Sequence, residues 1–339
     1  MLRLSVLDQS VALAGVPHGE SIRRTVALAQ HCERLGYARF WLSEHHNHPT
    51  IVGTAPEILM AAIAATTSRI RIGSAGIMLP HYAPFKVAEQ FRVLDALAPG
   101  RIDMGLGRAP GSDGRTAFAL NPMANERPAR FPADVRDLMA WVHGEPLAEG
   151  NPFAQVKAYP QGETAPETWI LGSSDYGAQV AAHFGLPYCF AWFFTDGLGA
   201  DQALEIYKRN YRPSARHPEP HAGLCVWALA ADSEKEAQHH FASRAKSRVL
   251  RDRGILGPIE PSDVAAAYEF SPFEAQRIEQ LRRDSYVGTP EQVAPRIQEL
   301  ADVMGVQEIA VVTWVHDEAV RRRSYELLAQ AFGLAKPAG

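Results

Sequence analysis

Short apolar runs alternate with helical patterns along nearly the whole chain, and this alternation constrains the fold more than any other feature. Eight runs have the length and composition of strands: residues 4–7, 38–43, 70–77, 101–106, 168–171, 188–194, 224–230 and 308–314. Most of them are apolar on both faces, which is typical of strands covered on both sides. Between them lie segments with helical spacing, several of which end at a glycine, as at Gly36, Gly185 and Gly305.

Eight strand–helix units in a row predict an α/β fold in which a parallel sheet closes into a (β/α)8 TIM barrel. We expect a single domain over residues 1–339, with a doubly wound open sheet as the alternative fold. The segments between predicted strands four and five and between strands seven and eight are longer than the other connections, which predicts insertions after strands four and seven. The second insertion, residues 249–287, mixes Gly, Pro and charged residues, which is compatible with a lid over the barrel mouth or with a surface excursion without function.

Composition and charge argue against nucleic acids and membranes as binding partners. The 339 residues carry a net charge of -4 and have a pI near 6.4, so no basic surface for nucleic acid is expected. No stretch approaches the roughly 20 apolar residues that cross a bilayer, and the N-terminus does not resemble a signal peptide. Cys32, Cys189 and Cys225 are too far apart for a metal-binding pair and indicate no disulfide framework. We therefore expect a cytoplasmic protein that binds neither membranes nor nucleic acid.

The stretch WLSEHHNHPT ends the second predicted strand, so its histidines fall at the predicted active face of the barrel. His45 is our candidate acid/base, because imidazole titrates near neutral pH and the neighbouring Glu44 could influence its charge. His46 could support it, whereas a structural role is favoured for His48. A metal site is not predicted, since no HExxH or repeated His/Cys spacing supplies further ligands.

The fourth strand leads into GLGRAPG, residues 105–111. Its spacing and its position after the fourth strand argue against a dinucleotide-binding turn. We expect Gly105 and Gly107 to let a ligand approach the backbone and Arg108 to place a positive charge in the mouth, although Arg108 could instead pair with a loop carboxylate.

Ser173 and Ser174 stand between the fifth strand and the helix that ends at Gly185. A serine there is a natural N-cap, but the same position leaves backbone N–H groups and the positive end of the helix dipole facing the barrel mouth. Because Arg108 follows the neighbouring strand, the two features together predict a phosphate site.

Four segments resemble the bacterial luciferase-like monooxygenase family, whose members are flavin-dependent enzymes on a (β/α)8 barrel. The segments are WLSEHH, IGSAGIMLPHYAPFKVAEQFRVLDALAPGRIDMGLGRAPG, GSSDYGAQVAAHFGLPYCFAW and VGTPEQV. The resemblance implies that FMN lies over the mouth, with its ring on a non-proline cis peptide at Ala75–Gly76, and that His45 works as an acid/base. It implies an FMN phosphate near Arg108, Ser173, Ser174, Tyr176 and Gly177, and an aromatic, Trp192, near the flavin.

The resemblance also implies a reaction. Reduced FMN would react with O2 to give a flavin hydroperoxide, which inserts one oxygen atom into a small apolar organic substrate. Because no NAD fingerprint is present, a separate NAD(P)H:flavin reductase would supply the reduced FMN, and relatives suggest a homodimer formed through helices near strands two and three. Leu106 replaces a cysteine that luciferase carries beside its flavin, so light emission is not expected. Two alternatives stay open: an F420-dependent oxidoreductase, and a flavin-binding protein without turnover.

Overall fold

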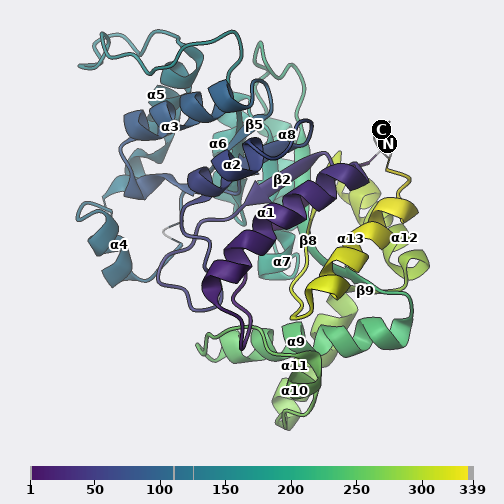
Figure 1. Ribbon diagram of the computed structural model, residues 1–339. Helices are drawn as coiled ribbons and strands as arrows, with labels where there is room; N and C mark the ends of the chain where they lie inside the picture. The colour runs from purple at the N-terminus through teal and green to yellow at the C-terminus, as the bar shows by residue number, and fades with distance from the viewer. Residues whose placement is uncertain (1, 110, 125, 335–339) are drawn as a thin grey trace.

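The computed structural model describes residues 2–109, 111–124 and 126–334, and its strands form a closed parallel barrel surrounded by helices (Figure 1). The barrel strands are β1 Arg3–Asp8, β2 Arg39–Leu42, β3 Arg71–Ser74, β5 Ile102–Gly107, β6 Glu167–Gly172, β7 Tyr188–Phe190, β8 Ala222–Ala230 and β10 Glu308–Val312. Closure is shown by β10, which pairs with both β1 and β8. The predicted (β/α)8 barrel is therefore confirmed, and an open sheet is excluded.

Two strand predictions need correction. The predicted strand 70–77 is interrupted by a cis peptide bond between Ala75 and Gly76, so that β4 Ile77–Met78 follows β3 as a separate strand paired with β5. The predicted strand 188–194 ends at Phe190, because residues 192–195 turn into the short helix α7 Trp192–Thr195.

One further strand, β9 Tyr286–Gly288, was not predicted. β8 is nine residues long, and only its residues 222–227 pair with the neighbouring barrel strands. Its last three residues project past the barrel, and β9 pairs with them from Ala228 to Ala230.

Helices cover the outside of the barrel, and most of the glycines and caps expected from the sequence end or begin them. The helices are α1 His18–Leu35, α2 Pro56–Ala64, α3 Pro84–Leu97, α4 Gly114–Leu120, α5 Phe131–His143, α6 Asp175–Phe184, α8 Ala200–Asn210, α9 Glu234–Asp252, α10 Ser262–Ala266, α11 Pro272–Asp284, α12 Pro290–Met304 and α13 Glu318–Ala331, with 3-10 turns η1 Leu79–His81 and η2 Arg127–Arg130. Gly36 ends α1 in the left-handed region at φ 87°, which favours glycine. None of the described helices combines the length and the apolar character needed to cross a membrane.

The two long connections contain the additional elements. α4, η2 and α5 lie between β5 and β6, and α9, α10, α11, β9 and α12 lie between β8 and β10. Figure 1 shows α9, α10 and α11 grouped at one end of the molecule. The predicted lid, residues 249–287, begins inside α9 and ends inside β9.

The barrel interior is packed with large aromatic side chains. Trp41 and Trp169 meet edge to face with ring centroids 5.0 Å apart, and Trp227 belongs to the same buried cluster. Along β8, Cys225 and Trp227 point into the barrel while Leu224 and Val226 pack against the outer helices. The interior is thus a filled core, not a channel.

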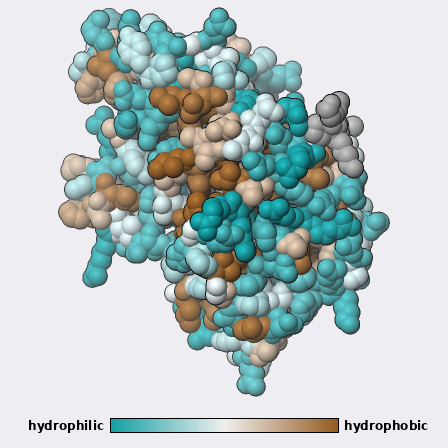
Figure 2. Space-filling model, in the orientation of Figure 1, coloured by the Kyte–Doolittle hydropathy of each residue, from teal (hydrophilic) through white to brown (hydrophobic). Residues whose placement is uncertain are grey.

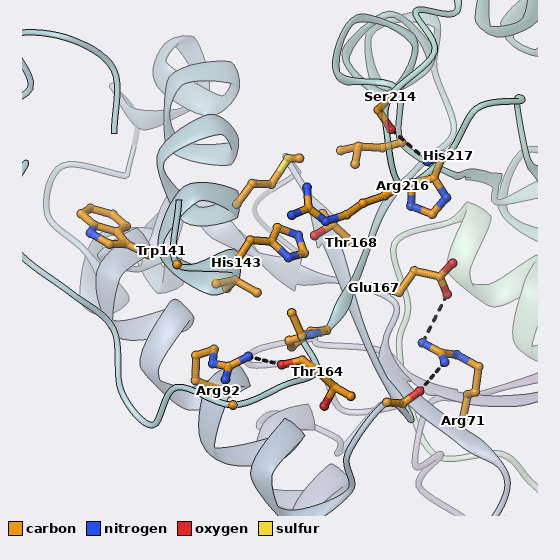
Figure 3. Close-up of a pocket in the computed structure, with 18 of the residues that line it drawn as sticks. Arg71, Arg92, Trp141, His143, Thr164, Glu167, Thr168, Ser214, Arg216 and His217 are labelled. Atoms are coloured by element: carbon orange, nitrogen blue, oxygen red, sulfur yellow. Dashed lines mark hydrogen bonds and ion pairs between the residues drawn. The ribbon is translucent and has the colours of Figure 1, made fainter. Parts of the chain in front are cut away.

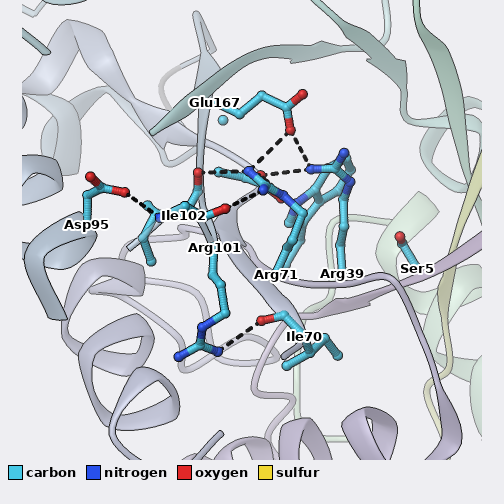
Figure 4. Close-up of polar contacts among 12 residues, drawn as sticks. Ser5, Arg39, Ile70, Arg71, Asp95, Arg101, Ile102 and Glu167 are labelled. Carbon is cyan, nitrogen blue, oxygen red and sulfur yellow. Dashed lines mark hydrogen bonds and ion pairs between the residues drawn. The ribbon is translucent and has the colours of Figure 1, made fainter. Parts of the chain in front are cut away.

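Charged side chains close the barrel at the end where the strands begin. Arg39 lies 2.8 Å from Asp103, 2.7 Å from Glu167 and 3.0 Å from Glu308. Arg71 joins the network through Asp103 at 2.6 Å, and Figure 4 shows Arg39 and Arg71 converging on Glu167. Because three acidic groups surround the arginines, these buried charges compensate one another.

A cavity of about 810 Å³ opens at this same end (Figure 3). Its lining is mostly polar. Two arginines of the lining already have partners: Arg92 donates to the Thr164 carbonyl at 2.6 Å, and Arg216 pairs with Glu145 at 2.5 Å. Active sites of (β/α)8 enzymes are built at the opposite face, from the loops that follow the strands. We therefore look for the site there.

Candidate functional site

A second cavity, of about 580 Å³, lies at the face where the strands end. Of the nine site residues predicted from the sequence, eight line it: His45, Ala75, Gly76, Arg108, Ser173, Ser174, Tyr176 and Gly177. They follow β2, β3, β5 and β6, which are neighbours in the barrel. The closed barrel thus gathers residues that are up to 132 positions apart in the sequence around one space.

Close contact between β3 and β5 explains the glycines of IGSAG and DMGLG. The Ser74 hydroxyl donates to the Gly105 carbonyl at 2.8 Å, and the Gly105 N–H donates back to the hydroxyl at 3.1 Å. A Cβ added at Gly105 would lie 2.0 Å from the Ser74 carbonyl oxygen, and one at Gly76 would lie 2.7 Å from the Gly105 carbonyl oxygen. Glycine at 105 therefore serves strand packing, which corrects the expectation that it admits a ligand, whereas Gly107 does line the cavity.

Glu44 is fully buried at the end of β2 and organises the loop around it. Its carboxylate lies 2.7 Å from His46 Nε2 and accepts hydrogen bonds from the Tyr82 hydroxyl at 2.7 Å and the Met78 N–H at 3.1 Å. The expectation that Glu44 acts on His45 is therefore wrong. Its partner is His46, and both histidines line the cavity.

His45 is a partly buried imidazole that lines the cavity. Burial, reinforced by the nearby His48, lowers the pKa of His45 to about 4. The ring is consequently neutral at pH 7, so that it can accept a proton on one nitrogen or donate a hydrogen bond from the other.

His48 has a structural role. Its Nδ1 accepts hydrogen bonds from the backbone N–H groups of Thr50 and Ile51 at 3.2 and 3.1 Å. These bonds close the turn after the histidine cluster. Within the three described ranges, no group of three or more His, Cys, Asp or Glu side chains is arranged to hold a metal ion.

Arg108 and the start of α6 form a niche for an anion. The Arg108 guanidinium stacks on the Tyr176 ring, 4.0 Å from its centroid, and forms no ion pair with any described residue. Ser174 is the N-cap of the ten-residue helix α6, but its side chain makes no capping hydrogen bond. Free hydroxyl groups, helix N–H groups and an unpaired guanidinium thus face the same part of the cavity, which is the donor set that phosphate requires.

The position of Trp192 differs from the prediction. Its ring packs over Gly197, where an added Cβ would lie 2.4 Å from it, and it is not among the residues that line the cavity. Phe193 and Phe194 line the cavity instead, because the chain turns into α7 after β7 and changes the direction of successive side chains. The segment AWFFT contains three successive aromatic residues, and the sequence did not indicate which of them face the cavity.

Leu256 is a lining residue that sequence analysis did not identify. It comes from the connection between α9 and α10, which is tied to the barrel loops by Gly257 N–H donating to the Thr50 hydroxyl at 3.2 Å and by Ile259 N–H donating to the Ala12 carbonyl at 2.8 Å. Part of the predicted lid segment therefore reaches the edge of the cavity.

Known proteins are similar in sequence to this chain along nearly its whole length. A family model described as luciferase-like monooxygenase matches residues 2–308. The chain is 42% identical over 334 residues to the uncharacterized protein YwcH of Bacillus subtilis (strain 168), with 98% of this chain and 99% of YwcH covered. It is 34% identical over 339 residues to the N-acetyl-S-alkylcysteine monooxygenase of the same organism, with 99% and 100% covered.

Solved structures share the fold. Apo-MsnO8 superimposes with a TM-score of 0.88 at 34% identity, over 99% of this chain and 100% of that one. The oxygenating constituent of 3,6-diketocamphane monooxygenase in complex with FMN gives a TM-score of 0.70 at 17% identity, covering 98% and 97%. An F420-dependent secondary alcohol dehydrogenase gives 0.64 at 15% identity, covering 97% and 98%. The last two likenesses concern the fold alone.

Proposed function

The chain belongs to the luciferase-like monooxygenase family and is a flavin-dependent monooxygenase; on that premise we propose that it uses reduced FMN and O2 to oxygenate a small organic substrate. FMN is chosen because of the anion niche formed by Arg108 and the start of α6. This niche lies in the same cavity as Ala75, Gly76 and His45. A single phosphate matches the donors and the charge of this niche.

The residues of the cavity fit FMN. Arg108, the hydroxyl groups of Ser173 and Ser174 and the first N–H groups of α6 would hold the phosphate. Ala75 and Gly76 would lie under the ring, and Gly172 offers space beside it, since a Cβ added there would meet no atom within 4 Å. Bound reduced FMN would supply the electrons that activate O2 for transfer of one oxygen atom.

The chain's own residues would exclude water and handle a proton. Met78, Leu171 and Phe193 give the cavity an apolar wall, which lowers the access of water to the reacting groups. His45 is partly buried and neutral at pH 7, so one ring nitrogen can take a proton from a reacting group or from water. Glu44 positions the adjacent loop through His46 and Tyr82.

The proposed use of FMN and O2 is tested against two alternatives. An F420-dependent oxidoreductase would bind F420 more tightly than FMN, and a flavin-binding protein without turnover would bind FMN but consume no O2 with any substrate. Binding constants for FMN and F420, measured by flavin fluorescence, distinguish the first case. Oxygen consumption with reduced FMN and a panel of small thioethers, chosen because one relative is named for N-acetyl-S-alkylcysteine, distinguishes the second.

Replacement of His45 by alanine tests the proton role. We expect turnover with reduced FMN to fall at least about 100-fold, which is the low end for loss of a general acid/base, while the affinity for FMN stays close to that of the wild type. Unchanged turnover in the variant would remove His45 from the mechanism.

A separate NAD(P)H:flavin reductase is proposed as the source of reduced FMN. The helix after GLGRAPG is α4, and the N–H groups at its start are already occupied: the Asp113 carboxylate accepts hydrogen bonds from Arg115 N–H at 2.9 Å and Thr116 N–H at 3.1 Å. A carboxylate at that position repels a pyrophosphate. Direct reduction of bound FMN by NADPH with the purified protein would contradict this proposal.

We also infer a homodimer formed through α2 and α3. Figure 2 shows apolar side chains gathered over these helices, and Ile58, Val93 and Leu97 are 68%, 48% and 58% exposed. Large apolar side chains that cluster on a helical surface are typical of an interface.

A further inference from the structure

Two polar side chains in the wall of the cavity at the barrel mouth are buried without a hydrogen-bond partner. Gln9 follows β1 and Ser43 follows β2; both line the cavity, and each is only 4% exposed. Gln9 Oε1 and Ser43 Oγ form no hydrogen bond with a described residue. Because buried polar atoms of folded proteins are almost always hydrogen-bonded, we looked for a ligand group that could pair with these two.

Strand pairing places the two side chains next to each other and next to Ala75. The Ser43 N–H donates to the Asp8 carbonyl at 3.1 Å, which places Gln9 opposite Ser43 in the pairing of β1 with β2. The Ala75 N–H donates to the Leu42 carbonyl at 2.7 Å, which places Ser43 opposite Ala75 in the pairing of β2 with β3. Gln9, Ser43 and Ala75 therefore form one row across three neighbouring strands.

Both side chains face the inside of the barrel. Leu7 and Trp41, which precede Gln9 and Ser43 by two residues, belong to the buried cluster inside the barrel and also line the cavity. Side chains two residues apart along an extended strand point to the same side. Gln9 and Ser43 therefore lie above Leu7 and Trp41, where the barrel interior opens into the cavity.

This part of the cavity carries no fixed charge. Its lining residues from β1, β2 and the position after each strand are Leu7, Gln9, Trp41 and Ser43. Asp8 lies between two of them in the sequence but forms an ion pair with Arg321 of α13, outside the barrel. The arginine and the aspartate of the lining, Arg108 and Asp113, both come from the connection after β5. A neutral group with a donor and an acceptor therefore suits this part better than an ionised one.

The row extends away from the phosphate niche. The barrel order is β1, β2, β3, β5, β6, and the niche is formed by residues that follow β5 and β6. In the proposed function the flavin ring lies on Ala75, and Gln9 is two strands away from Ala75 in the other direction. At the usual strand spacing this separation is about 10 Å. Gln9 therefore borders the part of the cavity that is left for the substrate.

From this geometry we propose that Gln9 and Ser43 bind one neutral amide group of the substrate, so that the substrate is an apolar molecule that carries a secondary amide. This inference rests on the proposed function, because it names the substrate class of the same cavity. The Gln9 side-chain oxygen would accept a hydrogen bond from the amide N–H, and the Ser43 hydroxyl would donate one to the amide carbonyl. The apolar part of the substrate would lie against Leu7, Trp41 and Cys225, which line the cavity beside them.

The test uses the full chain and a pair of ligands, N-benzylacetamide and benzyl acetate, which differ only in that an ester oxygen replaces the amide N–H. Binding is measured by titration calorimetry with and without oxidised FMN. The wild type is expected to bind the amide about tenfold more tightly than the ester, because the ester leaves the Gln9 oxygen without a donor. Gln9→Met should reduce this ratio to about one, whereas Gln276→Met, which removes an exposed carboxamide from α11, should keep it. Ser43→Ala should weaken both ligands to a similar extent, because both keep the carbonyl group.

Thermal unfolding separates a role in binding from a structural role. Methionine is similar to glutamine in size and removes a buried oxygen without a partner, so Gln9→Met should not lower the Tm of the ligand-free protein. The same variant should abolish the rise in Tm that N-benzylacetamide causes in the wild type. A lower ligand-free Tm with an unchanged preference for the amide would make Gln9 a structural residue and overturn the inference. Equal affinities of the wild type for amide and ester, or no binding of either, would also overturn it.

Flavin binding separates this inference from the proposed function. FMN affinity is followed by quenching of flavin fluorescence in the wild type and in Gln9→Met, and it should be the same in both. Preference for the amide without FMN binding would refute the flavin proposal and leave the amide subsite standing. FMN binding without that preference would do the reverse. A large loss of FMN affinity in Gln9→Met, with no preference for the amide in the wild type, would assign Gln9 to the flavin ring and overturn the inference.

Discussion

Replacement of Arg108 by methionine is the sharpest test of the phosphate niche. The guanidinium is exposed, stacked on Tyr176 and free of ion pairs with the described residues, so a phosphate would be its principal charged partner. Two unit charges 4 Å apart interact by about 1 kcal/mol in water and about 4 kcal/mol near a protein surface. For an exposed arginine we take about 2 kcal/mol, which is also typical of a charge-assisted hydrogen bond. The dissociation constant for FMN should therefore rise about 30-fold.

Riboflavin supplies the matched ligand, because it has the same ring and no phosphate. Arg108→Met should leave the affinity for riboflavin within about twofold of the wild type. Arg115→Met is the matched variant, since Arg115 is an exposed arginine of the same connection, at the start of α4, and it should affect neither ligand. Both affinities are measured by quenching of flavin fluorescence at low and at high salt, where screening should weaken the Arg108 effect. Equal losses for FMN and riboflavin, or no loss for FMN, would refute the assignment of the phosphate to this niche.

Three further outcomes are expected. The His45 imidazole has a pKa of about 4 in the folded protein against 6.5 for the free group. Protonation therefore lowers the free energy of unfolding by up to about 3 kcal/mol as the pH falls from about 6.5 toward 4, and this loss is absent above about pH 6.5. His45→Gln should show a smaller loss of Tm between these two pH values, and an unchanged pH profile would contradict the burial argument. Arg39→Met leaves the buried carboxylates of Asp103 and Glu308 and the partly buried carboxylate of Glu167 with less compensation. Chemical denaturation should therefore show a free energy of unfolding lower by about 3–5 kcal/mol, and a change below about 1 kcal/mol would show that the network is dispensable. The double variant Ile58→Glu, Leu97→Glu should convert the proposed dimer to a monomer in analytical ultracentrifugation, whereas a wild type that is already monomeric would exclude this interface.

For the histidine cluster, the sequence predicted the position of His45 but not the hydrogen-bond partners of Glu44. Position at the end of a strand correctly placed His45 in the cavity, because every strand of a parallel barrel ends at the same face. The partner of Glu44 could not be inferred in the same way. Tyr82 and the Met78 N–H come from the next strand–helix unit, and their distance from Glu44 depends on how β2 packs beside β3 and β4.

The sequence alone determined the barrel, the helix ends at glycines and the position of His45, Arg108, Ser173 and Ser174 at the cavity, because these follow from local periodicity and from the chain order of strand ends. The resemblance to the luciferase-like family added Ala75, Gly76, Tyr176 and Gly177, which also line the cavity. Tertiary structure decided the direction of side chains after Phe190, where a turn of helix gave Phe193 the place expected for Trp192. It also decided which charges form ion pairs: Arg39 pairs with Glu167 and Glu308, which lie far away in the chain, whereas Arg244 stacks on Trp227 and forms no ion pair with a described residue. Pairing of this kind depends on distances of a few ångströms between segments that only the closed barrel brings together, and no pattern along the chain contains those distances.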